Sequence, residues 1–415
     1  MYKKEKYIFD SSGWQINAGL LDKTKNTVLS FREKRENNQV PIFSIIDSDG
    51  DIEEIINNSK FFTKNELKDF ILIGTGGSSL GADALIQSYK YKNLNSGINF
   101  HILDNLDPNS VSKIFNLINP KTSKFLAISK SGKTTETIVL LLIVIDWLQK
   151  NDIKLDKSIM VMCQVHDNQD QEIIEIAKTY NLKIIQHENV GGRFAALTST
   201  GLLPATIMGL DPYSIRSAAR NTLNDVFNDN LFILASSVFS NIGIKEKKLN
   251  CVIHYGDALG SFVGWYRQLW NESLGKDSKG TFLITGKGSV DQHSQLQMWL
   301  DGPNIANYTF LKINNKEGYK IPKSEITPWL SNFSAGEILN IMADSTYDAL
   351  KESGRAVRNI SIQNASPESI ASLMVTFILE VLVVSELLGV DPYSQNAVEA
   401  IKKNSAKRFK KYELN

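Results

Sequence analysis

The sequence is poor in cysteine: Cys163 and Cys251 are the two cysteines among 415 residues, and they lie far apart. It therefore predicts neither a disulfide framework nor a cysteine-based metal site. Two free thiols are typical of a reducing compartment. No histidines, cysteines and carboxylates stand at the spacing of metal ligands, so we expect no bound metal.

An excess of one charge sign is also missing. The chain has 46 Lys and Arg residues against 45 Asp and Glu residues, a formal net charge of +1. Proteins that bind nucleic acids or anionic membrane surfaces through their overall charge are usually more basic. We therefore expect neither a nucleic acid nor a membrane surface as partner.

Long apolar runs free of charge are absent as well. The N-terminus, MYKKEKYIFDSSGW, has no apolar core of signal-peptide length. Residues 137–148 are too few to span a bilayer, and residues 369–390 are interrupted by Glu380 and Glu386. Because charges near the middle of a span are costly in lipid, we interpret residues 369–390 as a buried core helix. We expect a cytoplasmic protein.

The sequence is rich in short apolar runs, and each run is followed by a stretch with a helical pattern. They are apolar at nearly every position, as parallel strands buried on both faces are. The first set ends near GLDPYS (209–214), and a second set follows. The pattern predicts an α/β fold with two domains, each a mainly parallel sheet flanked by helices, and helical N- and C-terminal segments. The expected parts are an N-terminal helical segment (1–40) that packs on the second domain, a first domain (41–208) and a second domain with C-terminal helices (209–415).

The stretch ILIGTGGSSLG (71–81) predicts a phosphate-binding turn. A glycine-rich turn between a buried strand and a helix presents unpaired backbone N–H groups at the positive end of the helix dipole. Gly74 and Gly76 fit the start of the dinucleotide fingerprint, but Ser79 stands where its third glycine belongs. Asp104, at the end of the next strand, could bind a ribose. This turn alone leaves the ligand open between a dinucleotide and a sugar phosphate.

A second turn, SKSGKTTET (129–137), favours the sugar phosphate. Hydroxyls at positions 129, 131, 134 and 135 gather in one helix-opening turn beside Lys130. Helix capping would use one or two of these hydroxyls, but not four. A phosphate monoester, with several terminal oxygens that accept hydrogen bonds, suits such a row of donors. A dinucleotide site has no need of this second cluster.

Together with these two turns, four further motifs resemble the glucose-6-phosphate isomerase family of the sugar isomerase (SIS) fold, over about residues 70–403. They are GGRFAALTSTGLLPATIMGLD (191–211), QLWNESLGKDSKG (268–280), GSVDQHSQLQMWLDGP (288–303) and DPYSQNAVEAIKK (391–403). The resemblance implies two SIS-type domains and interconversion of glucose 6-phosphate and fructose 6-phosphate through a cis-enediol(ate), in glycolysis and gluconeogenesis. It also implies that the reaction needs no cofactor and that the protein is a homodimer with shared active sites.

The resemblance also implies roles for individual residues. Glu272 matches the family's base, Arg193 the group that steadies the enediolate charge, and His293 a histidine from the partner subunit that assists ring opening. Lys402 matches a lysine near the ring oxygen. The residues expected to bind the substrate are Gly77, Ser78, Ser129, Lys130, Ser131, Thr134, Gln268 and Gln395.

Three positions depart from the family's usual pattern: Ala195, Ser394 and Ala397. These residues support the catalytic groups and are not catalytic themselves. We therefore expect the departures to affect the rate and the secondary specificity more than the type of reaction. The alternatives are another SIS-type phosphosugar isomerase, which should lack the set of four catalytic residues, and a non-catalytic phosphosugar-sensing regulator, which should lack the base. A dinucleotide-binding oxidoreductase is a further alternative.

Overall fold

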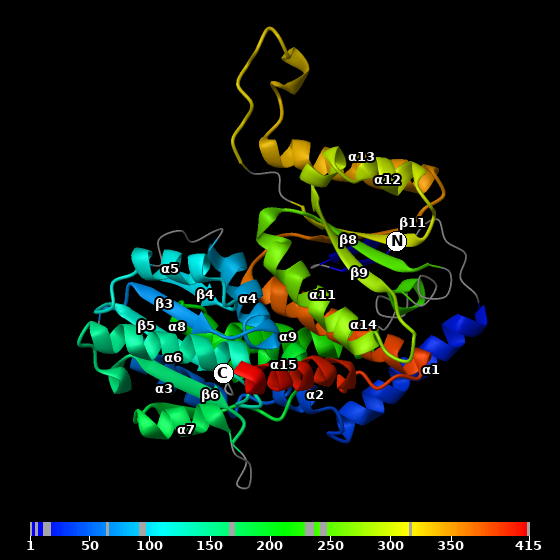
Figure 1. Cartoon of the computed structure of the whole chain (residues 1–415). Coiled ribbons are helices and arrows are strands. Elements are labelled where there is room, and N and C mark those ends of the chain that lie inside the picture. Colours follow the sequence, from blue (N-terminus) through cyan, green and yellow to red (C-terminus); the bar gives the residue numbers. More distant parts are fainter. Residues whose placement is uncertain are drawn as a thin grey trace.

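Two sheets, each flanked by helices, form the protein (Figure 1). The computed structural model describes residues 2–4, 7–10, 18–63, 66–90, 97–165, 171–228, 236–240, 247–314 and 318–412. Both sheets are mainly parallel, which confirms the predicted α/β class. One sheet contains strands from residues 69–186, and the other contains the strands after residue 248 together with two N-terminal strands.

The first sheet has five parallel strands in the order β4-β3-β5-β6-β7. Their bounds are β3 (Asp69–Ile73), β4 (Asn99–Leu103), β5 (Ser123–Ile128), β6 (Ile159–Cys163) and β7 (Lys183–Gln186). Alternate residues of β3 face opposite layers, as the period of a strand requires. Phe70 and Leu72 pack with α3 (Ile52–Thr63), α4 (Leu80–Lys90) and α8 (Ser199–Ile207). Ile71 and Ile73 pack with α5 (Pro108–Leu117), α6 (Thr135–Lys150) and α7 (Glu172–Thr179).

The second sheet has six strands in the order β1-β2-β11-β10-β8-β9. The parallel strands are β8 (Leu249–Tyr255), β9 (Phe282–Gly288), β10 (Ala306–Ile313) and β11 (Ala356–Ile362). One face packs against α11 (Gly260–Leu274) and α14 (Pro367–Leu388), and the other packs against α12 (Leu296–Asp301) and α13 (Ala335–Glu352). The C-terminal α15 (Glu399–Tyr412) completes the described chain.

The N-terminal segment is only partly the helical segment that the sequence predicts. α1 (Ala18–Glu36) is helical and contacts α14 and α9 (Pro212–Asn228). Before it, β1 (Tyr2–Lys4) and β2 (Tyr7–Asp10) are strands, and β2 pairs antiparallel with β11 of the second sheet. The edge of that sheet supplies the backbone partners for β2, a long-range effect that local pattern does not show. The domain limits at residues 40 and 208 remain predictions.

The long apolar helix α14 is the buried core helix that the sequence predicts. The Ser366 hydroxyl caps its first turn, and Gly389 ends it with φ 65°. It is long and apolar enough to cross a membrane, but most of it is buried within the protein. Glu380 is fully buried in this helix and pairs with Arg358 of β11, while Ser236 and Ser240 donate to its carboxylate. The charge that interrupts the apolar run is therefore compensated inside the core.

Candidate active site

A cleft of about 740 Å³ lies at the carboxyl ends of strands in the first sheet, where α/β sheets commonly bind ligands. Six chain segments meet there. They are the turn after β3, the turn after β5, Gln164 directly after β6, Gly191 with the start of the 3₁₀ helix η3 (Gly192–Leu197), helix α11, and residues 393–395. The residues that line it are Thr75, Gly76, Gly77, Ser78, Lys130, Ser131, Lys133, Thr134, Gln164, Gly191, Gly192, Arg193, Gln268, Glu272, Tyr393, Ser394 and Gln395.

The glycines at the cleft are required by close approach of two turns. A Cβ on Gly77 would lie 2.2 Å from the carbonyl carbon of Gly192, so neither turn could come as near with a side chain at residue 77. Gly76 has φ 56°, and a Cβ there would meet the Gln268 amide at 2.8 Å. Gly77 therefore lets the phosphate-type turn lie against the turn that carries Arg193, and Gly76 leaves room for the Gln268 amide.

The hydroxyl-rich turn faces the cleft at the N-terminus of the 16-residue helix α6. Ser131 and Thr134 line the cleft, and so does Lys130, whose pKa is lowered by burial. Ser129 is different: it is buried and donates its hydroxyl to Thr134 Oγ1 at 3.0 Å. Ser129 therefore supports Thr134 from behind and does not line the cleft itself.

Gln171 holds this turn from the protein interior. Its amide nitrogen donates to the backbone oxygens of Ser131 (3.0 Å) and Gln164 (2.9 Å). A Cβ on Gly132, which has φ 69°, would meet Gln171 and Cys163 at 3.0 Å. No local pattern indicates this role for Gln171, because its contact with the turn spans 40 residues.

Arg193 is buried at the cleft wall, and its guanidinium donates to five acceptors. Its side chain is 2% exposed. Nε donates to Ser273 Oγ (2.9 Å), and Nη1 donates to Glu272 Oε2 (3.2 Å) and Gln395 Oε1 (2.9 Å). Nη2 donates to the backbone oxygens of Pro392 (2.5 Å) and Ser394 (3.1 Å). Burial lowers the pKa of Arg193 and the neighbouring Glu272 raises it, and arginine stays protonated under such conditions.

Glu272 projects from α11 into the cleft with its side chain 35% exposed. Its two carboxylate oxygens have different partners. Oε2 accepts from Arg193, and Oε1 accepts from Gln268 Nε2 at 3.0 Å, four residues earlier on the same helix. The Gln268 amide lies over Gly76, so Glu272 is linked to the first turn through one side chain.

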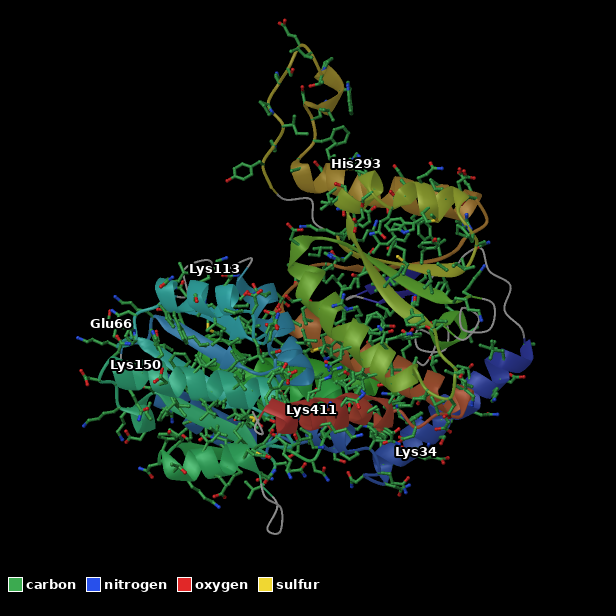
Figure 2. All side chains as sticks on the ribbon, in the orientation of Figure 1. Lys34, Glu66, Lys113, Lys150, His293 and Lys411 are labelled. Carbon is green, nitrogen blue, oxygen red and sulfur yellow. The ribbon has the colours of Figure 1, made fainter. Side chains whose placement is uncertain are left out.

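His293 and Lys402 are not among the residues that line the cleft. His293 is exposed in the 3₁₀ turn η5 (Val290–His293), which follows β9, and Figure 2 shows it beside α12 and α13. Lys402 belongs to α15, and its side chain lies outside the described residues. The cleft thus brings together Gly77, Ser78, Lys130, Ser131, Thr134, Arg193, Gln268, Glu272 and Gln395 from the predicted set.

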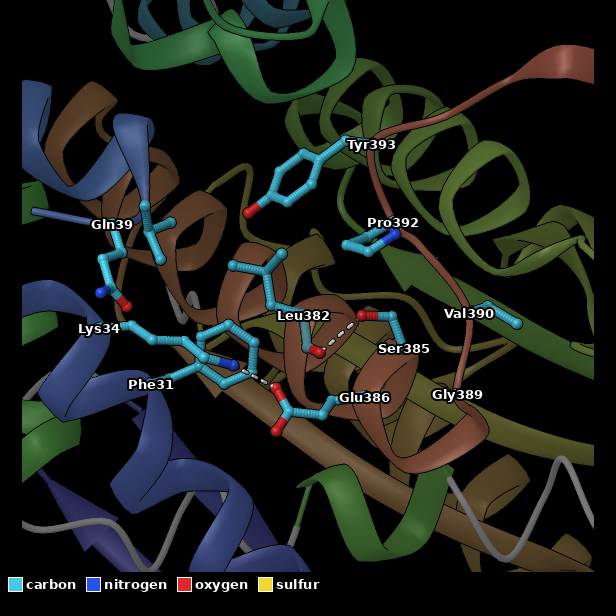
Figure 3. Close-up of a pocket in the computed structure, with 11 residues that line it drawn as sticks. Phe31, Lys34, Gln39, Leu382, Ser385, Glu386, Gly389, Val390, Pro392 and Tyr393 are labelled. Carbon is cyan, nitrogen blue, oxygen red and sulfur yellow. Dashed lines mark hydrogen bonds and ion pairs between the residues drawn. The ribbon is translucent and has the colours of Figure 1, made fainter.

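Sequence reasoning missed several cleft residues. Lys133 lies within the second motif, and Gln164 directly follows a buried strand, so both positions carried a usable signal. Tyr393 also lines a second cavity of about 410 Å³ between α1 and the end of α14, which Figure 3 shows. Tyr393 therefore stands at the wall between two cavities, with its ring 5.3 Å from that of Phe194. Burial, followed by the charge of Asp391, raises the pKa of Tyr393 to about 12.

The two sheets have the fold of SIS-type phosphosugar isomerases. A solved structure of a hypothetical protein from Thermus thermophilus superposes with a TM-score of 0.82 at 26% identity and covers 94% of this chain and 95% of its own. A glucose-6-phosphate isomerase from Chlamydia trachomatis superposes with a TM-score of 0.84 over 99% and 90% of the two chains; at 16% identity this similarity concerns the fold.

Sequence comparison identifies the family. The family model described as phosphoglucose isomerase matches residues 52–413, and the chain belongs to this family. It is accordingly an aldose–ketose isomerase. The glucose-6-phosphate isomerase of Rubrobacter xylanophilus is 31% identical over 352 residues, which are 81% of each protein. That of Carboxydothermus hydrogenoformans is 26% identical over 411 residues, covering 93% of this chain and 88% of the relative.

Proposed function

We propose that the chain interconverts glucose 6-phosphate and fructose 6-phosphate, in glycolysis and gluconeogenesis, with Glu272 as the base. The observation that carries the proposal is a partly exposed carboxylate beside a buried guanidinium, in one cleft with two phosphate-type turns. A non-catalytic phosphosugar sensor would have no use for a carboxylate base there.

The carboxylate and the guanidinium have different roles in the proton transfer. Glu272 takes the proton from C2 of the open-chain aldose, which leaves a cis-enediol(ate), and returns it to C1. The proton of the O2 hydroxyl moves to O1, which completes the ketose. Arg193 supplies positive charge to the enediolate oxygens without acting as a proton source. Because Nη1 of Arg193 donates to both Glu272 and Gln395, we expect a substrate oxygen to replace one of these two acceptors. That exchange also frees an oxygen of Glu272 for the carbon-bound proton.

The phosphate is proposed to lie between the two turns. Ser78, Ser131 and Thr134 offer hydroxyls, the backbone N–H groups of Gly77 and Lys130 add donors, and the start of α6 adds its dipole. Ser129 contributes by fixing Thr134. Gln268 and Gln395 are proposed to contact the sugar.

We further propose a cytoplasmic homodimer in which His293 and Lys402 complete the sites, His293 reaching the site of the partner subunit to assist ring opening. His293 is exposed on the second sheet's outer side, away from the residues of its own cleft. Nearby, residues 318–334 rise above α13 (Figure 1, gold) and expose Tyr319 (93%), Ile326 (92%) and Trp329 (70%). Large apolar side chains on a projecting segment are typical of a protein interface. Neither a nucleic acid nor a membrane is a partner in this proposal, and no metal or cofactor takes part.

The phosphate assignment is tested by the double variant Ser131→Ala, Thr134→Val. We expect the KM for fructose 6-phosphate and the Ki of inorganic phosphate to rise about 10-fold or more, because a hydrogen bond to a charged group contributes roughly 1.5–3 kcal/mol. The value of kcat should change little. Thr135→Val, at an exposed neighbour outside the cleft lining, is the matched control and should leave both constants unchanged. Unchanged constants in the double variant would place the phosphate elsewhere.

A further inference from the structure

Lys276 joins the end of the helix that carries Glu272 to the C-terminal segment 391–395. It stands just after α11, and its ammonium donates to the backbone oxygen of Ser273 at 3.0 Å and to the backbone oxygen of Asp391. Lys276 does not line the cleft. Burial, followed by the nearby charge of Arg193, lowers its pKa.

The segment that Lys276 contacts orients Arg193. The Asp391 carboxylate accepts from the amides of Tyr393 (2.9 Å) and Ser394 (3.1 Å), and its pKa is lowered, first of all by the bond from Tyr393. This turn directs backbone oxygens toward the cleft wall. Three of the five acceptors of the guanidinium of Arg193 come from residues 392–395: two backbone oxygens on Nη2 and the Gln395 side chain on Nη1.

We propose that Lys276 is a positioning residue for Arg193, an inference that rests on the proposed function of that arginine. Glu272 and Ser273 lie on α11, whereas the other acceptors of Arg193 lie on the C-terminal segment. Lys276 ties the two elements together, so it sets the placement of the guanidinium relative to the carboxylate. A misplacement of about 1 Å in a catalytic arrangement can cost about 10²-fold in rate.

The test is Lys276→Met, which keeps most of the apolar stem and removes the donor. We expect kcat to fall about 10- to 100-fold with KM within about 3-fold, because the phosphate turns are untouched. Affinity for inorganic phosphate should stay at the wild-type value. Affinity for a phosphorylated hydroxamate that mimics the enediolate should fall by the same factor as kcat/KM. Lys276→Arg, which retains donors, should recover part of the loss.

Lys279→Met is the matched control. Lys279 is an exposed lysine three residues further on, and it donates to the backbone oxygen of Leu388 at 2.9 Å, near the end of α14. Its variant should behave as wild type. A Lys276→Met protein that matches this control, or that loses phosphate affinity together with kcat, would overturn the inference.

Arg193→Lys, measured in parallel, separates the inference from the proposed function. If kcat falls strongly in Arg193→Lys but not in Lys276→Met, only the proposed role of Lys276 is overturned. A fully active Arg193→Lys enzyme would overturn the proposed role of Arg193 itself, and the positioning role with it.

Discussion

Replacing Glu272 by glutamine is expected to lower kcat and kcat/KM for isomerisation by about 10²–10⁴-fold or more, the range that a general base contributes. Glutamine keeps the size of the side chain but cannot take the proton from C1 or C2. The local structure should survive. Gln268 Oε1 is buried and has no hydrogen-bond partner among the described residues, so a rotated Gln268 amide could accept from the new side chain.

Measurements of ligand binding distinguish the loss of a catalytic base from the loss of the folded site. Affinity for inorganic phosphate and for sugar phosphate, measured by calorimetry, should remain close to wild type, because the phosphate turns are on other segments. Glu136→Gln, an exposed glutamate in the first turn of α6, is the control and should remain active. A Glu272→Gln enzyme within a few-fold of wild type would mean that another group takes the proton. Loss of binding together with turnover would give Glu272 a structural role.

Mixing two inactive proteins, Glu272→Gln and His293→Ala, is expected to restore activity to about a quarter of the wild-type level. Statistical exchange makes half of the dimers mixed, and each mixed dimer has one site with both residues intact. The other site of that dimer lacks both. The recovery should follow the time course of subunit exchange, which mass spectrometry of differently sized tags can measure.

Each variant mixed with itself provides the control for this experiment and should stay inactive. Exchange without recovered activity would contradict a site completed by the partner's histidine. Full activity of His293→Ala alone would remove His293 from the proposed chemistry and leave Glu272 and Arg193 untouched.

The buried strands of both sheets could be predicted because their apolar runs are uninterrupted, as in β3 and β6, where every residue is buried. The ends of α14 could be predicted because Ser366 and Gly389 act within a few residues of the helix. β11 has a weaker signal in the sequence, because Arg358 interrupts its apolar pattern. Arg358 is fully buried there only because Glu380, on α14, neutralises it across the core.

In the candidate site, too, some residues could be predicted from local motifs and others could not. Motifs at 76–78, 129–134 and 191–193 indicated cleft residues because each is a local turn at a strand or helix end. The roles of Gln171 and Lys276 depend on contacts 40 and 115 residues away. Local pattern carries no record of such contacts. The position of His293 outside the cleft of its own chain likewise has no sequence signal beyond family resemblance.

The central claim, isomerisation of a six-carbon sugar phosphate by this cleft, is tested most directly by supplying the purified protein with fructose 6-phosphate and coupling the product to glucose-6-phosphate dehydrogenase. The account predicts formation of glucose 6-phosphate at an enzymatic rate, competitive inhibition by inorganic phosphate, and loss of the signal in Glu272→Gln. Turnover of a different ketose phosphate, with no glucose 6-phosphate formed from fructose 6-phosphate, would contradict it.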